Sequence, residues 1–413
     1  MHVLWLTRFL PYPPFYGGDA LYSARLIEAL AESGAAITVL CHALDSNHRS
    51  PPPESAGQKT GRIDWKVMPP VDRATWTSLL GDLPSIAARF RSRTASAALR
   101  HALSNAGWDA VIIDHIGAAG LADGLDVLLP PGSPAGRRRP AIVYLSHNHE
   151  TSVRALTAAE YSGNPVKKMA LRREAAKVAR LEARLVEQAD IVTANTAEDA
   201  ALFRADNPGC APVIVTPGYS GPVVRARTID EITPRRATIV GSFGWIAKQM
   251  NLEAFLRVAA PAFAAAGAEI EILGTMPDAY KAKIARNWPT VLVRGRYDDV
   301  APYLADTRLG VVPEQTGGGF KHKVLSYAFC RVPVAALHGA VAGMPLADGD
   351  GIVFAPDMQS LTDTCLNALD DFALLNRLQD NAFAAVEHAF DWADRGRILA
   401  DAIAARTDGR KSV

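Results

Sequence analysis

Two successive series of short apolar runs, separated by longer segments with helical spacing, constrain the fold of this chain more than any other feature. The first series of strand-like runs lies at residues 2–6, 36–42, 110–114, 141–146, 190–195 and 212–216. The second lies at residues 237–244, 269–274, 290–295, 309–313, 332–337 and 351–355. Strands that alternate with helices form parallel sheets covered by helices on both faces. The pattern therefore predicts an α/β protein with two doubly wound domains.

The 413 residues are too many for one ordinary hydrophobic core, which agrees with two domains. Segment 221–236 carries prolines and charges without periodicity, so we expect it to link a first domain, residues 1–220, to a second. Segments 48–61 and 129–140 are rich in proline and are expected to be surface loops, whereas 167–189 predicts a long amphipathic helix. Ligands of such sheets bind at the carboxyl ends of the strands, so we expect the two domains to face a cleft that holds the site.

The overall composition excludes several classes of protein. A net charge of +1 lacks the basic excess of a general nucleic-acid-binding protein, so we expect no nucleic-acid partner. The four cysteines are scattered without the spacing of a zinc site or a disulfide framework and fit a reducing compartment. No apolar run approaches the roughly 18 residues of a membrane span, and the opening residues carry arginine and prolines where a signal peptide would be apolar. We therefore expect a cytoplasmic protein.

The segment between the first strand-like run and the first helical pattern ends in a glycine pair, Gly17 and Gly18. Glycines leave the backbone N–H groups of a helix N-terminus accessible, and these groups favour an anion or a polar ligand. An ordinary strand-to-helix turn explains the same residues, so both interpretations stay open at this point.

Six segments, taken in chain order, resemble corresponding segments of the GT-B glycosyltransferases, in particular of glycosyltransferase family 4. The resemblance extends over nearly the whole chain. The matching segments are PYPPFYGGDALYSARLIEALAESGAAITVL, QADIVTANTAEDAALF, VIVTPGYSG, IVGSFGWIAKQMNLEAFLRV, VRGRYDDVAPYLADTRLGVVP with GGGFKHKVLSYAFCRVPVAA, and FDWADRGRIL. The resemblance implies two Rossmann-like domains. It places the acceptor side in the first, the nucleotide-sugar site in residues 237–388, and a helix that crosses back to the first domain in residues 389–413.

The resemblance implies an enzyme that moves a sugar from a UDP- or GDP-linked nucleotide sugar to a hydroxyl acceptor. It also implies a hexosyltransferase of bacterial polysaccharide, glycolipid or glycoconjugate synthesis that retains anomeric configuration and uses no metal ion or other cofactor. Two alternatives stay open: a sugar-nucleotide epimerase on the same fold, and a non-catalytic partner subunit that binds sugar nucleotides.

The chain departs from the family pattern at three positions of the donor site. The family often carries two glutamates eight positions apart, and Gly318 and Ser326 stand there in this chain. A subgroup with a GxGxxxK pattern also lacks the first glutamate and is the closer match. The loss of the second leaves Ser326 as a weaker hydrogen-bonding group for a ribose, which keeps the non-catalytic alternative open. Ser242 stands where the family usually has an arginine.

Two glycine- and lysine-bearing loops of the second half form a candidate diphosphate site. A departing nucleotide diphosphate develops negative charge, so N–H donors and positive side chains must face it. The first loop, TGGGFKHKVLS, offers Gly318 and Gly319 before an expected helix, with Lys323 in its first turn as the leading phosphate ligand. A flexible glycine turn with solvated lysines is the alternative.

The second loop, GSFGWIAKQMN, supplies Gly241 and Gly244 for close backbone approach and Lys248 as a point charge. A surface lysine explains Lys248 equally well. Asn251 is expected to cap or orient the helix that follows.

Polar residues follow the run at 141–146, and polar residues at the carboxyl end of a strand point into the ligand crevice. The resemblance implies a histidine here that approaches the donor sugar; His147 matches best and His149 second. Capping of the next helix is the alternative, and no third ligand is visible for a metal site. If His147, Glu150 or Asp19 acts as a general base for the acceptor hydroxyl, inversion of the anomeric configuration is the alternative to retention. Asp19 also fits a simple helix start.

Asp348 and Asp350 imitate an Asp-x-Asp metal motif, but their glycine-rich turn explains them, so we predict no metal ligands. A basic stretch in the first half, with Arg137 to Arg139, offers peripheral contact with an anionic membrane surface or a lipid-linked acceptor at the inner face of the membrane. The basic stretch is segment 86–103, whose arginines are Arg89, Arg91, Arg93 and Arg100. An ordinary solvated helix face is the alternative explanation for these arginines.

Overall fold

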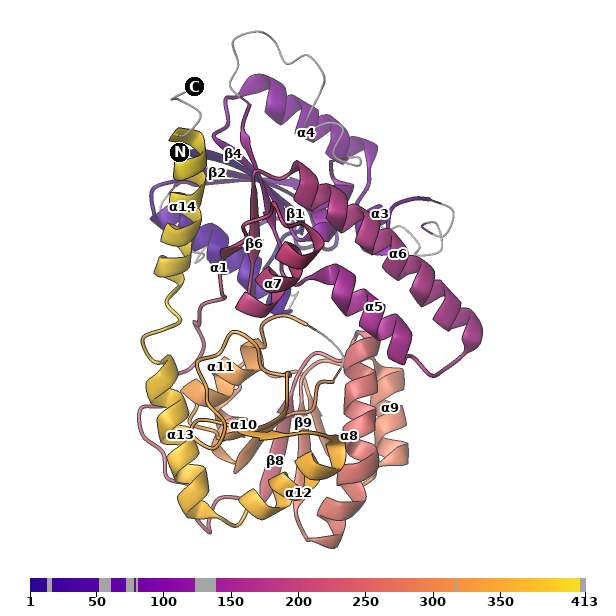
Figure 1. Cartoon of the computed structure of the whole chain (residues 1–413), viewed down its shortest axis with the longest axis vertical. Coiled ribbons are helices and arrows are strands. Elements are labelled where there is room, and N and C mark those ends of the chain that lie inside the picture. Colours follow the sequence, from indigo (N-terminus) through magenta and orange to yellow (C-terminus); the bar gives the residue numbers. More distant parts are fainter. Residues whose placement is uncertain are drawn as a thin grey trace. The chain divides into compact units, whose positions relative to one another are not determined.

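The structure, a computed structural model, describes residues 1–12, 17–51, 61–71, 78, 81–122, 139–315 and 318–408 (Figure 1). The chain divides into two compact units: unit 1 comprises Met1–Gly218 and Asp391–Val413, and unit 2 comprises Tyr219–Phe390. Much of the expected loops at 48–61 and 129–140 lies outside the described residues, as do Arg137 and Arg138. Within the described part of the chain, no helix has both the length and the apolar composition that a membrane-spanning helix requires.

Unit 1 is built on a parallel sheet whose described strands follow the order β3-β2-β1-β4-β5-β6-β7. The order reverses between β1 and β4, and doubly wound sheets bind ligands outside the carboxyl ends of the strands at such a switch point. The strands are β1 (His2–Phe9), β2 (Ala36–His42), β3 (Ile63–Met68), β4 (Ala110–Asp114), β5 (Ala141–Leu145), β6 (Ile191–Ala194) and β7 (Val213–Ile214).

Helices cover both faces of this sheet, and successive side chains of a strand point to opposite faces. Val3 and Trp5 of β1 pack with residues of α1 and α14, whereas Leu4 and Leu6 pack with residues of α4, α6 and α7. The central strands are therefore apolar over most of their length. The helices are α1 (Gly18–Glu32), α3 (Ser85–Ala88), α4 (Arg93–Asn105), the 3₁₀ helix η2 (Ile116–Gly120), α5 (Glu150–Glu160), α6 (Pro165–Gln188), α7 (Ala197–Asp206) and α14 (Trp392–Asp408).

The helix α14 packs along α1 although the whole of unit 2 separates the two in sequence (Figure 1). A Cβ atom on Gly396 would lie 2.4 Å from the carbonyl oxygen of Ala29, so glycine allows the two helices to approach closely. At the start of α14, the ring of Trp392 lies against Gly218, and Arg395 Nε donates to the carbonyl of Thr216 at 2.8 Å. These contacts make α14 part of unit 1.

Unit 2 repeats the architecture with described strands in the order β10-β9-β8-β11-β12-β13, again all parallel, and its switch point lies between β8 and β11. The strands are β8 (Arg236–Val240), β9 (Glu269–Leu273), β10 (Leu292–Gly295), β11 (Leu309–Val312), β12 (Val334–Leu337) and β13 (Val353–Ala355). The helices are α8 (Ile246–Ala265), α9 (Asp278–Asn287), α10 (Ala301–Ala305), α11 (His322–Phe329), α12 (Met358–Ala368) and α13 (Phe372–Val386).

All twelve strand-like runs contain strands, most of them shorter than the run, and the expected helix at 167–189 is α6. Helix α6 begins at Pro165 because the side chain of Asn164 accepts hydrogen bonds from the first free N–H groups. The sequence analysis missed β3. Burial alternates weakly along this edge strand, and Asp64 and Lys66 interrupt its apolar residues.

Segment 221–236, expected to link the domains, lies against unit 2. The Arg227 guanidinium donates to the carbonyl oxygens of Arg331 at 2.9 Å, Ala305 at 2.9 Å and Thr307 at 2.6 Å. Tyr219 stacks on Phe329 with ring centroids 4.2 Å apart. The chain therefore enters unit 2 directly after Gly218.

Replacing Gly396 by alanine tests the packing of α14 on α1. We expect the unfolding free energy of unit 1 to fall by about 1–3 kcal/mol, because the new methyl group meets the Ala29 backbone. In the control Gly107→Ala the Cβ meets nothing within 4 Å, so stability should stay or rise by up to about 1 kcal/mol. Scanning calorimetry measures both, and equal stability of the two variants would contradict this packing.

Candidate functional site

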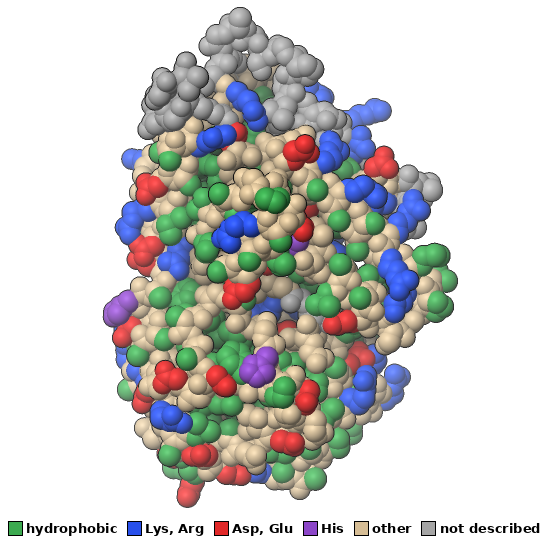
Figure 2. All heavy atoms as spheres, in the orientation of Figure 1, with side chains coloured by type: hydrophobic (Ala, Val, Ile, Leu, Met, Phe, Trp, Pro, Cys, Tyr) green, Lys and Arg blue, Asp and Glu red, His purple; other side chains and the backbone are tan. Residues whose placement is uncertain are grey.

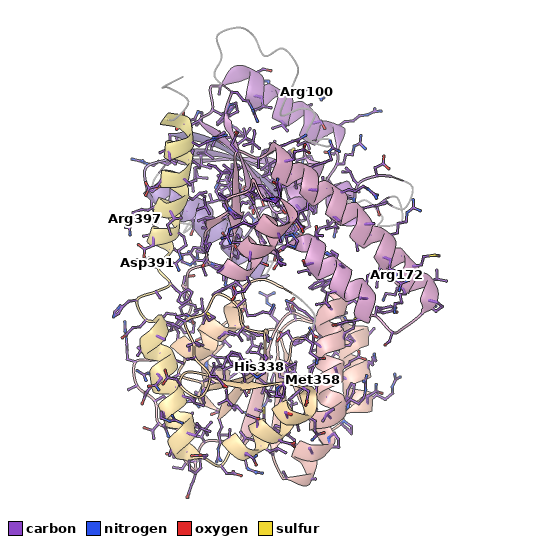
Figure 3. All side chains as sticks on the ribbon, viewed as in Figure 1. Arg100, Arg172, His338, Met358, Asp391 and Arg397 are labelled. Atoms are coloured by element: carbon purple, nitrogen blue, oxygen red, sulfur yellow. The ribbon has the colours of Figure 1, made fainter. Side chains whose placement is uncertain are left out.

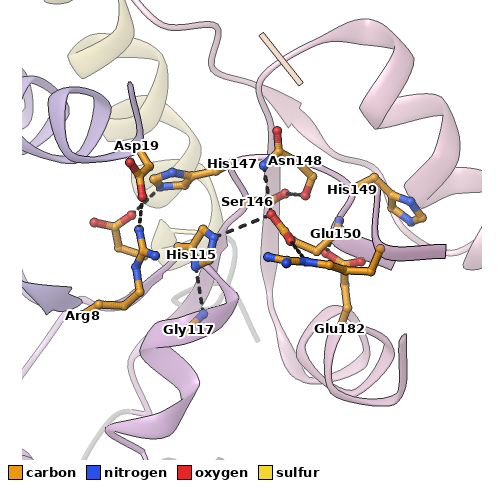
Figure 4. A network of polar contacts seen from close by, with 12 residues as sticks. Arg8, Asp19, His115, Gly117, Ser146, His147, Asn148, His149, Glu150 and Glu182 are labelled. Carbon is orange, nitrogen blue, oxygen red and sulfur yellow. Dashed lines mark hydrogen bonds and ion pairs between the residues drawn. The ribbon is translucent and has the colours of Figure 1, made fainter. Parts of the chain in front are cut away.

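At the switch point of unit 1, the carboxyl ends of β1, β4 and β5 and the start of α1 bring polar side chains together (Figure 4). The predicted residues Asp19, His147 and Glu150 are all in this group, beside Gly17, the N-cap of α1, which offers no side chain to the first turn of that helix. The complete group is Arg8, Asp19, Asp114, His115, His147 and Glu150.

Asp114 and His147 form the most buried pair of this group, with exposed fractions of 0% and 6%. His147 Nε2 lies 2.7 Å from Asp114 Oδ1, and the indole N–H of Trp5 donates to Oδ2 at 2.9 Å. Burial raises the pKa of Asp114, but the hydrogen bond and charge of His147 outweigh burial and hold the pKa below its ordinary value. His147 Nδ1 is buried and has no hydrogen-bond partner among the described residues.

His115 follows Asp114 with φ 70°, in the left-handed region that residues other than glycine rarely adopt. Its Nδ1 accepts a hydrogen bond from the Gly117 N–H at 2.9 Å, so the neutral ring carries its proton on Nε2, which lies 3.6 Å from Glu150 Oε1. Burial and the charge of Arg8 lower the pKa of His115 to about 4. His115 is therefore neutral at physiological pH.

The carboxylates of Asp19 and Glu150 are both paired with arginine. Asp19 contacts Arg8, whose side chain passes the bare face of Gly117, and Glu150 accepts from Arg154 Nε at 3.1 Å. Burial raises the pKa of each carboxyl group, but the neighbouring arginine outweighs it, and both pKa values lie well below the ordinary range. Such carboxylates are weak bases, which argues against the general-base role weighed for them from the sequence.

His149 does not join this group. As the N-cap of α5, its Nδ1 accepts a hydrogen bond from the Ser152 N–H at 3.3 Å. Glu182 of α6 accepts from the next free N–H groups of the same helix, those of Glu150 at 3.1 Å and Thr151 at 2.7 Å. Helix capping, left open for both histidines, thus describes His149 and not His147.

In unit 2, the loops after β8 and β11 meet at the switch point. A Cβ on Gly244 would meet nothing within 4 Å. Gly274, in contrast, packs against Gly241 so closely that a Cβ on Gly274 would lie 1.6 Å from the Gly241 carbonyl oxygen. Asn251, expected to cap or orient α8, instead accepts from the Gln315 N–H at 3.1 Å and ties α8 to the loop after β11.

The charges of three lysines act on one carboxylate, Glu314, which follows β11. Burial raises the pKa of Glu314, but Lys323, Lys321 and Lys248 together lower it below its ordinary value. Lys323 pairs directly with Glu314 Oε1, and the two side chains are only 12% and 14% exposed. Lys323 is therefore not the solvated lysine of the alternative interpretation. Helices α8 and α11 have Trp245 and Lys321 as their N-caps, and neither side chain accepts a hydrogen bond from the first turn of its helix. The N-cap side chain therefore satisfies none of the first N–H groups of either helix.

The glycine loop before α11 folds back on its own lysine. Lys321 Nζ donates to the carbonyl of Gly318 at 2.6 Å, and Gly319 adopts φ 71°, which its lack of a side chain permits. Ser326, one turn further along α11, interacts with the hydroxyl of Tyr219. The hydroxyl of Ser326 thus already has a partner within unit 2.

Among the described residues, no three histidine, cysteine or acidic side chains are grouped to hold a metal ion. Asp348 Oδ1 accepts from the Phe354 N–H at 2.8 Å, and Asp350 Oδ1 accepts from Asn381 Nδ2 at 2.7 Å. Asp348 therefore bonds to the backbone of the strand that follows the turn, and Asp350 ties the turn to α13.

Four residues of these groups were not predicted from the sequence. Asp114 and His115 end β4 in the same way that His147 follows β5, and Glu314 follows β11. The rule that selected His147 would have selected all three. Arg8 lies near the end of β1, where its positive charge was the available signal.

Comparisons with known proteins agree with this geometry. Residues 17–218 match the family described as "Glycosyl transferase 4-like domain", and residues 234–371 match "Glycosyl transferases group 1". No curated protein sequence matches the chain.

Several solved structures share the fold over nearly the whole chain. Sucrose-phosphate synthase from Thermosynechococcus elongatus is 16% identical, with 97% of each chain covered and a TM-score of 0.69. Anabaena HepE, solved with UDP-glucose, is 13% identical, with 98% of this chain and 100% of that chain covered and a TM-score of 0.63.

The lipopolysaccharide outer core galactosyltransferase WaaB is also 13% identical, covers 98% of this chain and 100% of its own, and has a TM-score of 0.56. The two family matches and the shared two-sheet fold show that this chain belongs to the family 4, or group 1, glycosyltransferases of GT-B fold.

Proposed function

We propose that this glycosyltransferase moves a sugar from a nucleoside-diphosphate sugar to a hydroxyl acceptor. The observation that carries the proposal is the convergence of two helix N-termini without side-chain caps and three lysines at the switch point of unit 2. Backbone N–H groups and fixed positive charge at one place match a leaving diphosphate. Lys248, Lys321 and Lys323 would neutralise this charge, so we propose that no metal ion is needed.

The glycines around the lysines give the phosphates access to the backbone. We assign Gly241, Gly244, Gly318 and Gly319 to this role, with Gly17 and Gly18 of unit 1 as further N–H donors, and Ser326 to the ribose. The nucleotide is UDP or GDP; the HepE structure with UDP-glucose, on the same fold, supports UDP.

The proposed reaction breaks the bond between the anomeric carbon and the diphosphate oxygen and forms a bond from that carbon to the acceptor oxygen. The weak basicity of Asp19 and Glu150 favours retention, in which the departing diphosphate takes the acceptor proton. We assign Asp19 to holding Arg8, and Glu150 to holding His115 and Arg154. His147 remains available to the sugar, because its Nδ1 has no other partner among the described residues.

The donor and acceptor point to bacterial polysaccharide, glycolipid or glycoconjugate synthesis, as in the lipopolysaccharide enzyme WaaB, which has a similar fold. All four cysteines are free, which suits the reducing cytoplasm. An epimerase would convert the donor without an acceptor, and a non-catalytic partner subunit would bind it without turnover. Product analysis separates the three.

Calorimetric titration with UDP, GDP, ADP, dTDP and CMP tests the diphosphate site. We expect micromolar binding of UDP or GDP, weakened about 10- to 100-fold in Lys323→Ala, because one charge-assisted contact is lost. Lys283→Ala is the matched control, since that lysine pairs with Glu253 at 2.6 Å outside the site.

The Lys323→Ala variant also leaves Glu314 without its direct partner, so the double variant Lys323→Ala/Glu314→Gln is measured beside it. Binding that recovers fully in the double variant would assign the loss to the unpaired Glu314 and remove Lys323 as a phosphate ligand. Absence of binding to all five nucleotides would favour a protein that has lost the donor site.

The stereochemical outcome and the metal requirement are measured together once the donor is known. Proton NMR of fresh product should show the anomeric configuration of the donor, and EDTA should leave the rate unchanged. An inverted product would assign a general base in unit 1, and loss of activity in EDTA would refute charge neutralisation by lysine alone.

We propose in addition that unit 1 contacts an anionic membrane surface, which would give access to a lipid-linked acceptor. Where α5 and α6 meet, Val166 and Met169 are 69% and 68% exposed. Hydrophobic side chains gather at this end of the pair beside positive ones (Figure 2), and Arg172 lies there (Figure 3). The exposed arginines singled out in the sequence are on or next to α3 and α4. The positive residues of the α6 end are Lys167, Lys168, Arg172 and Arg173.

Vesicle flotation tests this contact. We expect recovery with vesicles that contain phosphatidylglycerol and little with phosphatidylcholine alone, because positive charge and inserted apolar side chains act together. Val166→Asp/Met169→Asp should abolish recovery. Ile232→Asp, at a position that is 90% exposed in unit 2, should not. Equal recovery with neutral and anionic vesicles would refute the proposal.

A further inference from the structure

We propose that Asp114 is a positioning residue that fixes the tautomer of His147 so that Nδ1 accepts a hydrogen bond from a hydroxyl group of the bound sugar. The inference rests on the proposed sugar transfer. It assigns the hydroxyl-binding atom in unit 1 and explains why a carboxylate with no exposed surface ends β4.

The two oxygens of Asp114 already have donors. Oδ2 accepts from Trp5 Nε1 at 2.9 Å, and Oδ1 lies 2.7 Å from His147 Nε2. An ionised carboxylate only accepts hydrogen bonds, so Nε2 must carry a proton. In the neutral imidazole the other nitrogen, Nδ1, then holds a lone pair. The lowered pKa of Asp114 agrees with an ionised carboxylate.

The other rings that contact His147 have hydrogen-bond partners of their own, and neither bonds to Nδ1. Tyr22 meets the ring edge-on at 5.0 Å, and its hydroxyl donates to the carbonyl of Val215 at 2.8 Å. His115 meets it edge-on at 5.1 Å, with one nitrogen on Gly117 and the other facing Glu150.

The remaining contacts fix the position of His147 without using Nδ1. Asn195 Nδ2 donates to the carbonyl oxygen of His147 at 2.8 Å and holds its backbone. Asp19, the nearby carboxylate on α1, pairs with Arg8 (Figure 4). Nδ1 is the buried atom of this group that a sugar hydroxyl would satisfy.

Trp5 makes the inference testable by a reversal. In Asp114→Asn, the indole N–H still needs an acceptor, so the amide oxygen turns to Trp5 and the amide NH₂ turns to His147. Nε2 must then accept, and the proton moves to Nδ1, which can no longer accept from a hydroxyl. In Trp5→Phe/Asp114→Asn the indole N–H is gone, and the hydroxyl of Ser23, which also bonds to the Asp114 carboxylate, can accept from the amide NH₂. The amide can then turn so that its oxygen again accepts from Nε2.

The binding experiment compares a sugar nucleotide with its nucleoside diphosphate in the full-length protein. The probe is the tightest binder among UDP-glucose, UDP-galactose, UDP-N-acetylglucosamine and GDP-mannose. Asp114→Asn should weaken the sugar nucleotide about tenfold and leave UDP or GDP unchanged. Trp5→Phe alone should change little, and the double variant should recover most of the loss. A loss that affects nucleotide and sugar nucleotide alike, or one that the double variant does not reverse, would overturn the proposal.

Nitrogen NMR of ¹⁵N-histidine-labelled protein at pH 8 reads the tautomer directly, with His147→Gln to assign the signal. We expect Nδ1 without a proton in the natural protein, with a proton in Asp114→Asn, and without one again in the double variant. A protonated Nδ1 in the natural protein would overturn the proposal even if neither Asp114 variant folds. This readout needs no ligand, so failure of nucleotide binding would count against the proposed function and not against the tautomer.

Discussion

A parallel sheet places the carboxyl end of every strand on one edge, and the helices that follow begin at that edge with their N–H groups free. Both units obey this constraint, and each reverses its strand order once, between β1 and β4 in unit 1 and between β8 and β11 in unit 2. The two clusters of buried charged side chains described above lie at these two switch points.

Burying charge at these edges requires that each charged group have a partner. Unit 1 meets this need with Asp19 on Arg8, Glu150 on Arg154, and Asp114 between Trp5 and His147. Unit 2 carries an excess of positive charge, three lysines around Glu314. The first arrangement agrees with the sugar contact proposed for unit 1, and the second agrees with the diphosphate contact proposed for unit 2.

Much of this could be predicted from the residues alone, for a physical reason. Strands buried on both faces are mostly apolar, so their runs and the polar residues that follow them, such as His147, are visible in the sequence. An edge strand such as β3 alternates with polar residues and blends into its neighbouring loop. The pairing of charges is also invisible, because Lys323 meets Glu314, and Asp19 meets Arg8, through the folded chain. Roles that depend on these pairs, such as basicity, could not be read before the fold was known.

The return of α14 to α1 has a consequence for the order in which the protein forms. During synthesis the ribosome releases the sheet of unit 1 long before residues 391–408 exist, so the face of α1 that α14 covers stays open while all of unit 2 is made. Domains fold as units as the chain emerges. Unit 2 therefore has all its parts first, and unit 1, although it comes first in the sequence, is the last to close.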